Sequence, residues 1–269
     1  MTDTAPTFDA YDAYERFMGR WSRAVGPVFL DWVAPAANAR WLEVGCGTGI
    51  FTELVLDRCQ PRVLHAVDPA EATIEHLTAQ SIARRAVLQL GDALALPFEN
   101  GTFDIVVSAL VLTFIPDIPR ALSEMRRVAV PSAIIAGYVW DFSRELSPSG
   151  PLRRAMRNIG IQVPDLAGSS DSTESRLSAL FREAGFERVA TRSIEVSQVY
   201  ADFDDFWQAQ TTKYSPTTNA ISALSDDDRA ELKEAVLREL PSRDGQSVVY
   251  AARANAVVGR VPGDEASLA

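Results

Sequence analysis

Short apolar runs alternate with helical patterns through the middle of this 269-residue chain. The runs span four or five residues each, at residues 41–44, 63–67, 86–90, 103–107 and 133–136. Between them, residues 50–58, 71–83 and 119–128 carry apolar side chains three and four positions apart, as amphipathic helices do. Because parallel strands need crossover connections, which helices supply, this pattern predicts a doubly wound α/β fold. Its sheet should be mostly parallel and covered on both faces.

The flanking regions predict helices and two further strands. Residues 8–33 are rich in aromatic side chains at helical spacing, and the prolines and glycines of residues 141–168 indicate a loop with a helix at 152–158. A helix over 172–184, a strand over 186–200, helices over 203–240 and a strand over 247–258 follow. We therefore divide the chain into an N-terminal helical cap (1–39), an α/β domain (40–260) with insertions at about 141–170 and 203–240, and a tail (261–269).

Charge and cysteine content narrow the classes of partner. The net charge of −10 repels a phosphate backbone and argues against nucleic acid. Two cysteines, Cys46 and Cys59, form neither a disulfide framework nor a four-ligand zinc site, so we expect no metal and a reducing cytoplasm. The chain shows no signal-peptide profile and no apolar run near the roughly 20 residues that cross a bilayer. These features favour a cytoplasmic protein that acts on a small molecule away from membranes.

The strongest motif lies between the first run and the first helical pattern, where residues 43–49 read EVGCGTG. Three glycines there allow a sharp turn and a close approach of the backbone to a ligand. A dinucleotide site has a further glycine where this chain has Ile50, and no Lys-Ser/Thr pair follows as in a phosphate-binding loop. Because Glu43 would repel a pyrophosphate and attract a cation, the loop favours a positively charged, nucleotide-like cofactor.

Two more acids follow the next two predicted strands. Asp68 ends the second strand, where a carboxylate accepts hydrogen bonds from the two ribose hydroxyls of a nucleoside. Asp92 follows the third strand, where a short acid suits an adenine amino group. Since the carboxyl ends of parallel strands meet at one edge of a sheet, Glu43, Asp68 and Asp92 should converge on the same ligand.

With these motifs, residues 40–140 resemble the class I S-adenosylmethionine-dependent methyltransferases, in particular their small-molecule group. The resemblance also rests on residues 91–93, 96–98, 103–106, 108–110 and 116–128. It implies a Rossmann-like sheet of seven strands whose last strand is antiparallel, with S-adenosyl-L-methionine as the cofactor. One departure is Pro131-Ser132-Ala133, where the family usually has Pro-Gly-Gly; it should alter a turn without affecting cofactor binding. The cofactor contacts that the resemblance implies are Glu43, Gly45, Cys46, Gly47, Thr48, Gly49, Asp68, Pro69, Asp92, Ala93 and Ser108.

The substrate side is less defined. The reaction that the resemblance implies is methyl transfer to an O, N or C atom of a small organic molecule, and neither histidine stands where the family places a base. Asp141 could accept a substrate proton, Trp140 could stack on an aromatic acceptor, and Tyr14 is a third catalytic candidate. Arg20 could pair with the carboxylate of the cofactor. The catalytic residues and the acceptor remain open at this stage.

Two further expectations concern a lid over the pocket and an alternative function. The N-terminal helices and residues 141–168 should form a mobile lid that orders when the cofactor binds and keeps water out. The alternative function is an S-adenosylmethionine-binding protein of the same fold with a cyclase-like or regulatory role. The sequence leaves this alternative open, and it leaves open whether the chain is a monomer or a homodimer.

Overall fold

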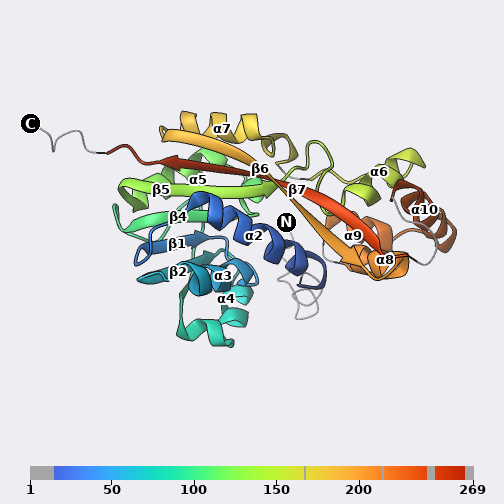
Figure 1. Ribbon diagram of the computed structural model, residues 1–269, viewed down its shortest axis with the longest axis horizontal. Coiled ribbons are helices and arrows are strands. Elements are labelled where there is room, and N and C mark those ends of the chain that lie inside the picture. Colours follow the sequence, from blue (N-terminus) through green and yellow to red (C-terminus); the bar gives the residue numbers. More distant parts are fainter. Residues whose placement is uncertain (1–14, 167, 214, 241–245, 264–269) are drawn as a thin grey trace, which may run out of the picture.

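The computed structural model describes residues 15–166, 168–213, 215–240 and 246–263. Its strands form one seven-stranded sheet in the order β3-β2-β1-β4-β5-β7-β6 (Figure 1). Strands β1 to β5 pair in parallel, whereas β7 runs antiparallel to both β5 and β6. The doubly wound sheet and its antiparallel last strand are thus confirmed. The strands are β1 (Arg40–Val44), β2 (Val63–Asp68), β3 (Val87–Leu90), β4 (Phe103–Ala109), β5 (Ala129–Trp140), β6 (Glu187–Tyr200) and β7 (Val248–Arg260).

The helices follow the predicted pattern with two differences. The helix predicted over 71–83 stops at Thr78 and resumes as a short 3-10 turn, because Gln80 takes an extended conformation. The helical region predicted over 203–240 divides into three helices, since Ser215 and Ser225 each cap a new one. The α-helices are α2 (Arg20–Val33), α3 (Ile50–Arg58), α4 (Glu71–Thr78), α5 (Ile118–Val128), α6 (Gly150–Asn158), α7 (Glu174–Glu183), α8 (Phe203–Thr211), α9 (Pro216–Ser222) and α10 (Asp226–Glu239). A π-helix, η1 (Glu15–Gly19), precedes α2, and the short 3-10 helices are η2 (Ser81–Arg84), η3 (Leu112–Phe114) and η4 (Ser169–Asp171).

Successive side chains of the central strands point to opposite faces of the sheet and so divide the core into two layers. Trp41 and Ile105 pack in the layer that holds α2 and α3, while Leu42 and Val106 pack in the layer of α5 and α7. Both faces of the sheet are therefore covered, which explains why the central strands read as nearly continuous apolar runs.

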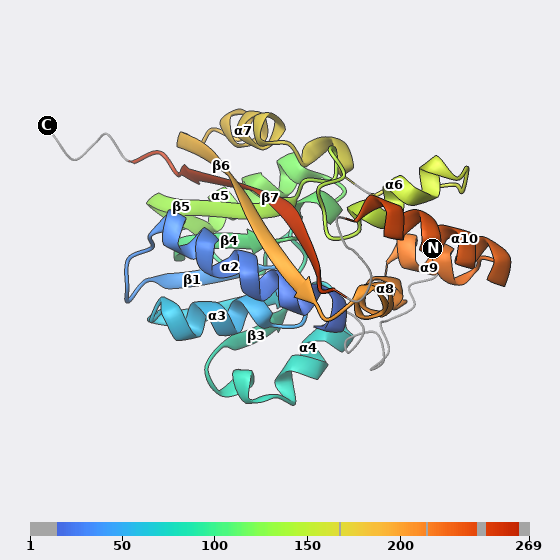
Figure 2. The ribbon, with the colours of Figure 1, turned by 45° about the vertical axis from the view of Figure 1, so that its right-hand side comes forward.

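The two insertions meet beyond one end of the sheet. In Figures 1 and 2 the long strands β6 and β7 extend past the other strands to a group of helices formed by α6, α8, α9 and α10. Side-chain contacts join this group: Arg154 on α6 pairs with Glu239 on α10 at 3.2 Å, and Arg153 Nη1 donates to Thr217 Oγ1 on α9 at 3.0 Å. The regions predicted as separate insertions thus form one helical extension.

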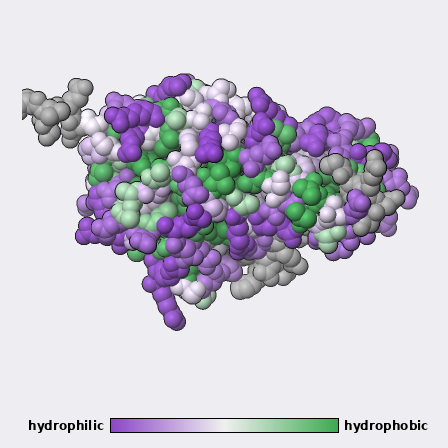
Figure 3. All heavy atoms as spheres, viewed as in Figure 1, coloured by the Kyte–Doolittle hydropathy of each residue, from purple (hydrophilic) through white to green (hydrophobic). Residues whose placement is uncertain are grey.

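The surface is mixed in character. On the face shown in Figure 3, hydrophilic residues cover most of the area and apolar residues gather in smaller groups between them. Among the residues that the structure describes, no helix is long and apolar enough to span a bilayer.

Candidate functional site

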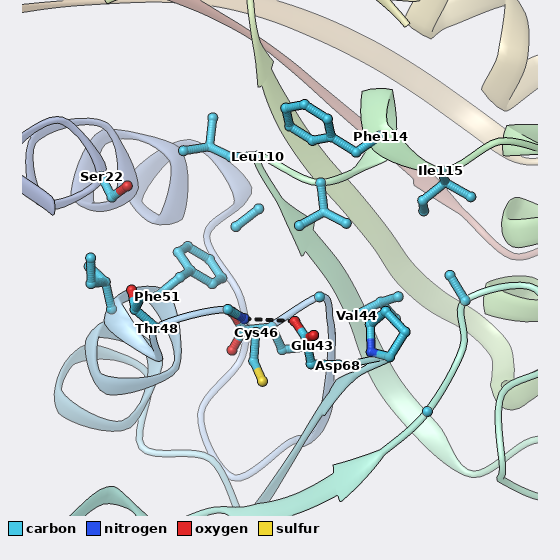
Figure 4. Close-up of a pocket in the computed structure, with 18 of the residues that line it drawn as sticks. Ser22, Glu43, Val44, Cys46, Thr48, Phe51, Asp68, Leu110, Phe114 and Ile115 are labelled. Atoms are coloured by element: carbon cyan, nitrogen blue, oxygen red, sulfur yellow. Dashed lines mark hydrogen bonds between the residues drawn. The ribbon is translucent and has the colours of Figure 1, made fainter. Parts of the chain in front are cut away.

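A cavity of about 300 Å³ lies where β1, β2 and β4 end (Figure 4). The order of the strands reverses between β1 and β4, because the chain leads from β1 outward through β2 and β3 and then returns to β4. Ligands of open α/β sheets bind at this kind of switch point, outside the carboxyl ends of the strands. The site therefore lies where the topology favours it.

The glycine loop forms one wall of this cavity. The backbone N–H groups of Gly45 and Cys46 both donate to the carbonyl of Val67, at 2.8 and 3.0 Å, which ties the loop to the end of β2. Gly45 has a φ of +83°, and a Cβ there would lie 2.6 Å from both methyl carbons of Val111. Gly47 has a φ of +50°, but no atom lies within 4 Å of the position of its missing Cβ. Glycine at 45 is thus required by packing, and glycine at 47 leaves the loop open toward the cavity.

Asp68 connects the end of β2 to the glycine loop. Its Oδ2 accepts a hydrogen bond from the backbone N–H of Gly47 at 3.0 Å, and its Oδ1 accepts one from Ala70 at 3.0 Å. Figure 4 shows the bond to the loop as a dashed line. Burial raises the pKa of Asp68, while the two backbone donors oppose the rise. Each carboxylate oxygen keeps a second lone pair for a donor in the cavity.

Glu43 lies deeper, at the end of β1. Its side chain is almost fully buried, and its Oε2 accepts a hydrogen bond from the hydroxyl of Thr52 at 2.6 Å. Burial raises the pKa of Glu43 to about 8; the bond from Thr52 opposes this rise and the charge of Asp68 adds to it. The carboxyl group is therefore mostly protonated at neutral pH, and a cation nearby would favour its ionised form.

Most of the residues predicted to bind the cofactor line this one cavity. Asp92 completes the set of acids; its Oδ1 accepts a hydrogen bond from the backbone N–H of Leu94 at 2.9 Å. Cys46 is buried, and burial raises the pKa of its thiol far above the usual range, which suits packing and not nucleophilic attack. The predicted residues on the wall are Glu43, Gly45, Cys46, Gly47, Thr48, Asp68, Pro69, Asp92 and Ala93.

The structure does not bring Gly49, Ser108 or Arg20 to the wall. Gly49 instead precedes the first turn of α3 with a φ of +81°. Ser108 is fully buried and donates to the carbonyl of Val44 at 3.1 Å. The guanidinium of Arg20 lies over the ring of Tyr200 on β6, 5.0 Å from its centre, and does not line the first cavity.

A second cavity adjoins the first on the side of the helical extension. It shares Leu110 and Phe114 with the first cavity. Leu110 has a φ of +63°, a strained value for leucine, and its backbone N–H donates to the carbonyl of Tyr138 at 2.8 Å. Phe114 is 56% exposed and packs against Phe142, with 6.3 Å between the ring centres. The full lining is Phe17, Met18, Leu110, Phe114, Trp140, Phe142, Pro148, Ser149, Leu166, Ser215, Pro216 and Thr217.

The three catalytic candidates fall in different places. Trp140 lines the second cavity. Asp141 is buried in a turn, where its Oδ1 accepts hydrogen bonds from Ser143 Oγ at 2.9 Å and the backbone N–H of Arg144 at 3.2 Å, and it lines neither cavity. Tyr14 lies outside the described residues. Asp141 thus holds a turn, and Trp140 is the one candidate that the structure brings to a cavity.

Sequence reasoning missed much of the apolar wall of the first cavity. Residues 110–116 follow β4, so the rule that strand ends face the ligand could have found them. Ser22 and Phe51 come from α2 and α3, and Tyr138 from β5; their roles depend on how these elements pack, and no local motif marks them. The wall residues that were not predicted as cofactor contacts are Ser22, Val44, Ile50, Phe51, Gly91, Ala109, Leu110, Val111, Phe114, Ile115, Pro116 and Tyr138.

Comparisons with known proteins agree with this geometry. A family described as "Methyltransferase domain" matches residues 42–136. A ubiquinone/menaquinone biosynthesis C-methyltransferase of Dinoroseobacter shibae is 30% identical over 204 residues, which cover 68% of this chain and 81% of that protein. A malonyl-[acyl-carrier protein] O-methyltransferase of Halorhodospira halophila is 35% identical over 97 residues, and the chain spans only 33% of its length.

Among solved structures, a phosphoethanolamine N-methyltransferase of Haemonchus contortus in complex with S-adenosyl-L-methionine has the same fold. The TM-score is 0.59 at 16% identity, and the match covers 97% of this chain and 58% of that one. At this identity the likeness concerns the fold alone.

Proposed function

This chain belongs to the class I S-adenosylmethionine-dependent methyltransferases, and we propose that its two joined cavities hold the two reactants. The protein transfers a methyl group from S-adenosylmethionine to a small molecule. The cavity at the switch point takes the cofactor, and the cavity beyond Leu110 and Phe114 takes the methyl acceptor. The observation that carries this division is the shared wall, since methyl transfer needs the acceptor atom beside the reactive carbon.

In the first cavity, three acids would hold different parts of the cofactor. Asp68 accepts from the ribose hydroxyls, which its free lone pairs and its anchored position support. Asp92 accepts from the adenine amino group. Glu43, buried and close to the glycine loop, faces the cationic end of the cofactor. Gly47 leaves room for the backbone to approach the ligand.

In the second cavity, the chain positions the methyl acceptor and excludes water. When bound, S-adenosylmethionine supplies a methyl group already activated by its sulfonium. The aromatic and aliphatic wall excludes water and holds an apolar acceptor in line. None of the described residues of this wall has a titratable side chain, so these residues supply no general base. We therefore infer that the acceptor carries its nucleophile in a reactive form, as a phenolate or an electron-rich carbon does.

The test of this function is turnover with a series of phenols and electron-rich ring compounds. S-adenosylhomocysteine should form in proportion to acceptor, and the rising limb of the pH–rate profile should move with the pKa of each phenol. A limb that stays at one pH across the series would indicate a protein base. Binding of S-adenosylmethionine without S-adenosylhomocysteine formation from any acceptor would favour the cyclase-like or regulatory alternative.

Glu43 gives a second expectation, which concerns protons. A cationic ligand lowers the pKa of Glu43 from about 8, so binding at pH 7 should release close to one proton per site. Affinity should rise between pH 7 and 9, as Glu43 becomes ionised before binding, and then level off. Titration calorimetry in buffers of different ionisation enthalpy measures the release.

The control for that measurement is Glu43→Gln. Its amide group has the size of the carboxyl group and keeps a carbonyl oxygen that can accept the hydrogen bond from Thr52, but it cannot ionise. It should lose most of the proton release. Equal binding enthalpies in all buffers for the unaltered protein would contradict the assignment of Glu43.

The class of acceptor, the compartment and the lid stay proposals. The net charge of −10 supports an acceptor other than nucleic acid, and the free thiols of Cys46 and Cys59 suit a reducing compartment such as the cytoplasm. The mobile lid formed by the N-terminal helices and residues 141–168 also stays a prediction; residues 8–14 of its N-terminal part lie outside the described residues, and residues 141–168 lead into the helical extension that borders the second cavity. Hydrogen exchange with and without S-adenosylhomocysteine should show added protection within residues 140–168.

A further inference from the structure

The loop between β3 and β4 carries Asp92 on the wall of the first cavity. The loop begins with a tight turn, in which Asp92 Oδ1 accepts a hydrogen bond from the backbone N–H of Leu94 at 2.9 Å and the Asp92 carbonyl accepts one from Ala95 at 3.0 Å. The side chain of Asp92 is exposed. Its position therefore depends on how the turn is held and not on close packing around the carboxylate.

An ion pair on α5 holds this loop beyond the turn. Glu124 and Arg127 lie three residues apart on the helix, with 2.7 Å between Oε2 and Nη2. Glu124 Oε2 accepts a hydrogen bond from the backbone N–H of Leu96 at 2.9 Å, and Arg127 Nη2 donates to the carbonyl of Leu96 at 2.9 Å. The pair thus engages both backbone groups of one loop residue, as a neighbouring antiparallel strand does. Arg127 Nη1 also donates to the carbonyl of Phe98 at 2.7 Å and to Asn100 Oδ1 at 3.0 Å.

The environment of the pair favours a fixed, charged arrangement. Glu124 is buried, and the hydrogen bond from Arg127 holds the pKa of its carboxyl group below the usual range, so both partners are charged at neutral pH. Hydrogen bonds to charged groups are stronger than those between neutral groups. Arg120 adds a third connection, because its Nε donates to the carbonyl of Leu94 at 3.1 Å. Neither Glu124 nor Arg127 lines the cofactor cavity, so they act on a ligand only through the loop.

We propose that the Glu124–Arg127 pair positions Asp92 for the adenine amino group and so makes the protein selective for an adenine cofactor over its deaminated counterpart. The pair fixes the loop at Leu96, and the turn that begins at Asp92 is then held from both sides, by β3 and by α5. Without the pair the exposed carboxylate is free to leave the line of the amino group. Glu124 and Arg127 are thus positioning residues. This inference rests on the proposed function, because it takes Asp92 as the acceptor for the adenine amino group.

The test compares S-adenosylhomocysteine with S-inosylhomocysteine, in which a carbonyl oxygen replaces the adenine amino group. Titration calorimetry should show at least about tenfold tighter binding of S-adenosylhomocysteine, because only this ligand offers Asp92 a donor at that position. In Arg127→Met the affinity for S-adenosylhomocysteine should drop until the preference is below about threefold. The affinity for S-inosylhomocysteine should not fall with it. A variant that only loosened the fold would weaken both ligands by the same factor, and that result would overturn the proposal.

Arg126→Met is the matched control. Arg126 is the neighbouring residue on α5 and is exposed, but its Nη1 donates to the carbonyl of Ala184 after α7, at 3.1 Å. This variant should keep the tenfold preference. A loss of preference in Arg126→Met as well would indicate a general effect of removing an arginine from α5 and would contradict the proposal.

Arg127→Lys decides the question if Arg127→Met does not fold. Lysine keeps the positive charge, but its single ammonium group cannot reproduce the planar set of donors that joins Glu124, Leu96 and Phe98. The preference for S-adenosylhomocysteine should therefore fall by at least about twofold in Arg127→Lys. An unchanged preference in this variant, or in a folded Arg127→Met, would overturn the proposal.

Asp92→Ala separates a failure of this inference from a failure of the proposed function. If the preference is lost in Asp92→Ala but kept in Arg127→Met, Asp92 still binds the adenine and only the role of the ion pair is rejected. If Asp92→Ala keeps the preference, or if the unaltered protein binds both ligands equally, the assignment of Asp92 and the inference are both rejected. Because these readouts are binding constants, they do not depend on finding the methyl acceptor.

Discussion

Replacing Asp68 with alanine should weaken the binding of S-adenosylmethionine by about a hundredfold. The substitution removes the acceptors of two backbone N–H groups, those of Gly47 and Ala70, and with them the connection between β2 and the glycine loop. It also removes the proposed bonds to the ribose hydroxyls. Hydrogen bonds to a charged group contribute about 1.5–3 kcal/mol each, so the loss of more than one amounts to roughly 3 kcal/mol even after water replaces part of them.

Two variants make this experiment specific. Asp68→Asn keeps one carbonyl oxygen and should fall between alanine and the unaltered protein. Asp57→Ala removes an exposed carboxylate that pairs with Arg85 at 2.7 Å, away from both cavities, and should leave the affinity unchanged. Titration calorimetry gives the dissociation constants of the three variants and of the unaltered protein. An unchanged constant in Asp68→Ala would reject the assignment of the ribose site.

Gly45→Ala should both lower stability and abolish measurable cofactor binding. Alanine at a φ of +83° is strained, and its Cβ would meet the two methyl groups of Val111 at 2.6 Å. Strain of about 1–2 kcal/mol and overpacking of similar size together suggest a loss of about 2–4 kcal/mol. Since the loop forms a wall of the cavity, the shift that relieves the clash also displaces the N–H groups that hold it on β2. Thermal unfolding and titration calorimetry measure the two effects.

Val111 and Gly47 provide the controls. The double variant Gly45→Ala/Val111→Ala removes the two contacts at 2.6 Å but keeps the Cβ of residue 111 at 3.0 Å and the strain, so it should recover part of the stability that Gly45→Ala loses. Gly47→Ala meets no atom within 4 Å and should cost only the strain, about 1 kcal/mol, while it still impedes the ligand. If Gly45→Ala and Gly47→Ala had equal stability, close packing against Val111 would not be the reason for glycine at position 45.

Local patterns in the sequence were enough to predict where the residues of the cofactor site lie in the fold. The alternation of runs and helices from Trp41 to Trp140 predicted parallel strands, and the glycine loop, Asp68 and Asp92 each follow one of them. These predictions succeed because the period of side chains and the conformational preference of glycine act over a few neighbouring residues. The carboxyl ends of parallel strands then meet at one edge wherever the connections are helical.

Tertiary packing alone decided the second cavity and the roles of its residues. Phe17, Trp140 and Thr217 come from η1, β5 and α9, three distant parts of the chain, and only the packing of these elements in the folded protein brings them to one cavity. The same holds for the stacking of Arg20 on Tyr200 and for the raised pKa of Glu43, which depends on burial under other elements. Sequence thus determined the α/β class and the cofactor edge, because the alternation of strands and helices and the position of the glycine loop follow from local pattern, whereas the strand order is seen only in the folded sheet. The acceptor side depends on contacts between segments far apart in the chain, which no local pattern specifies.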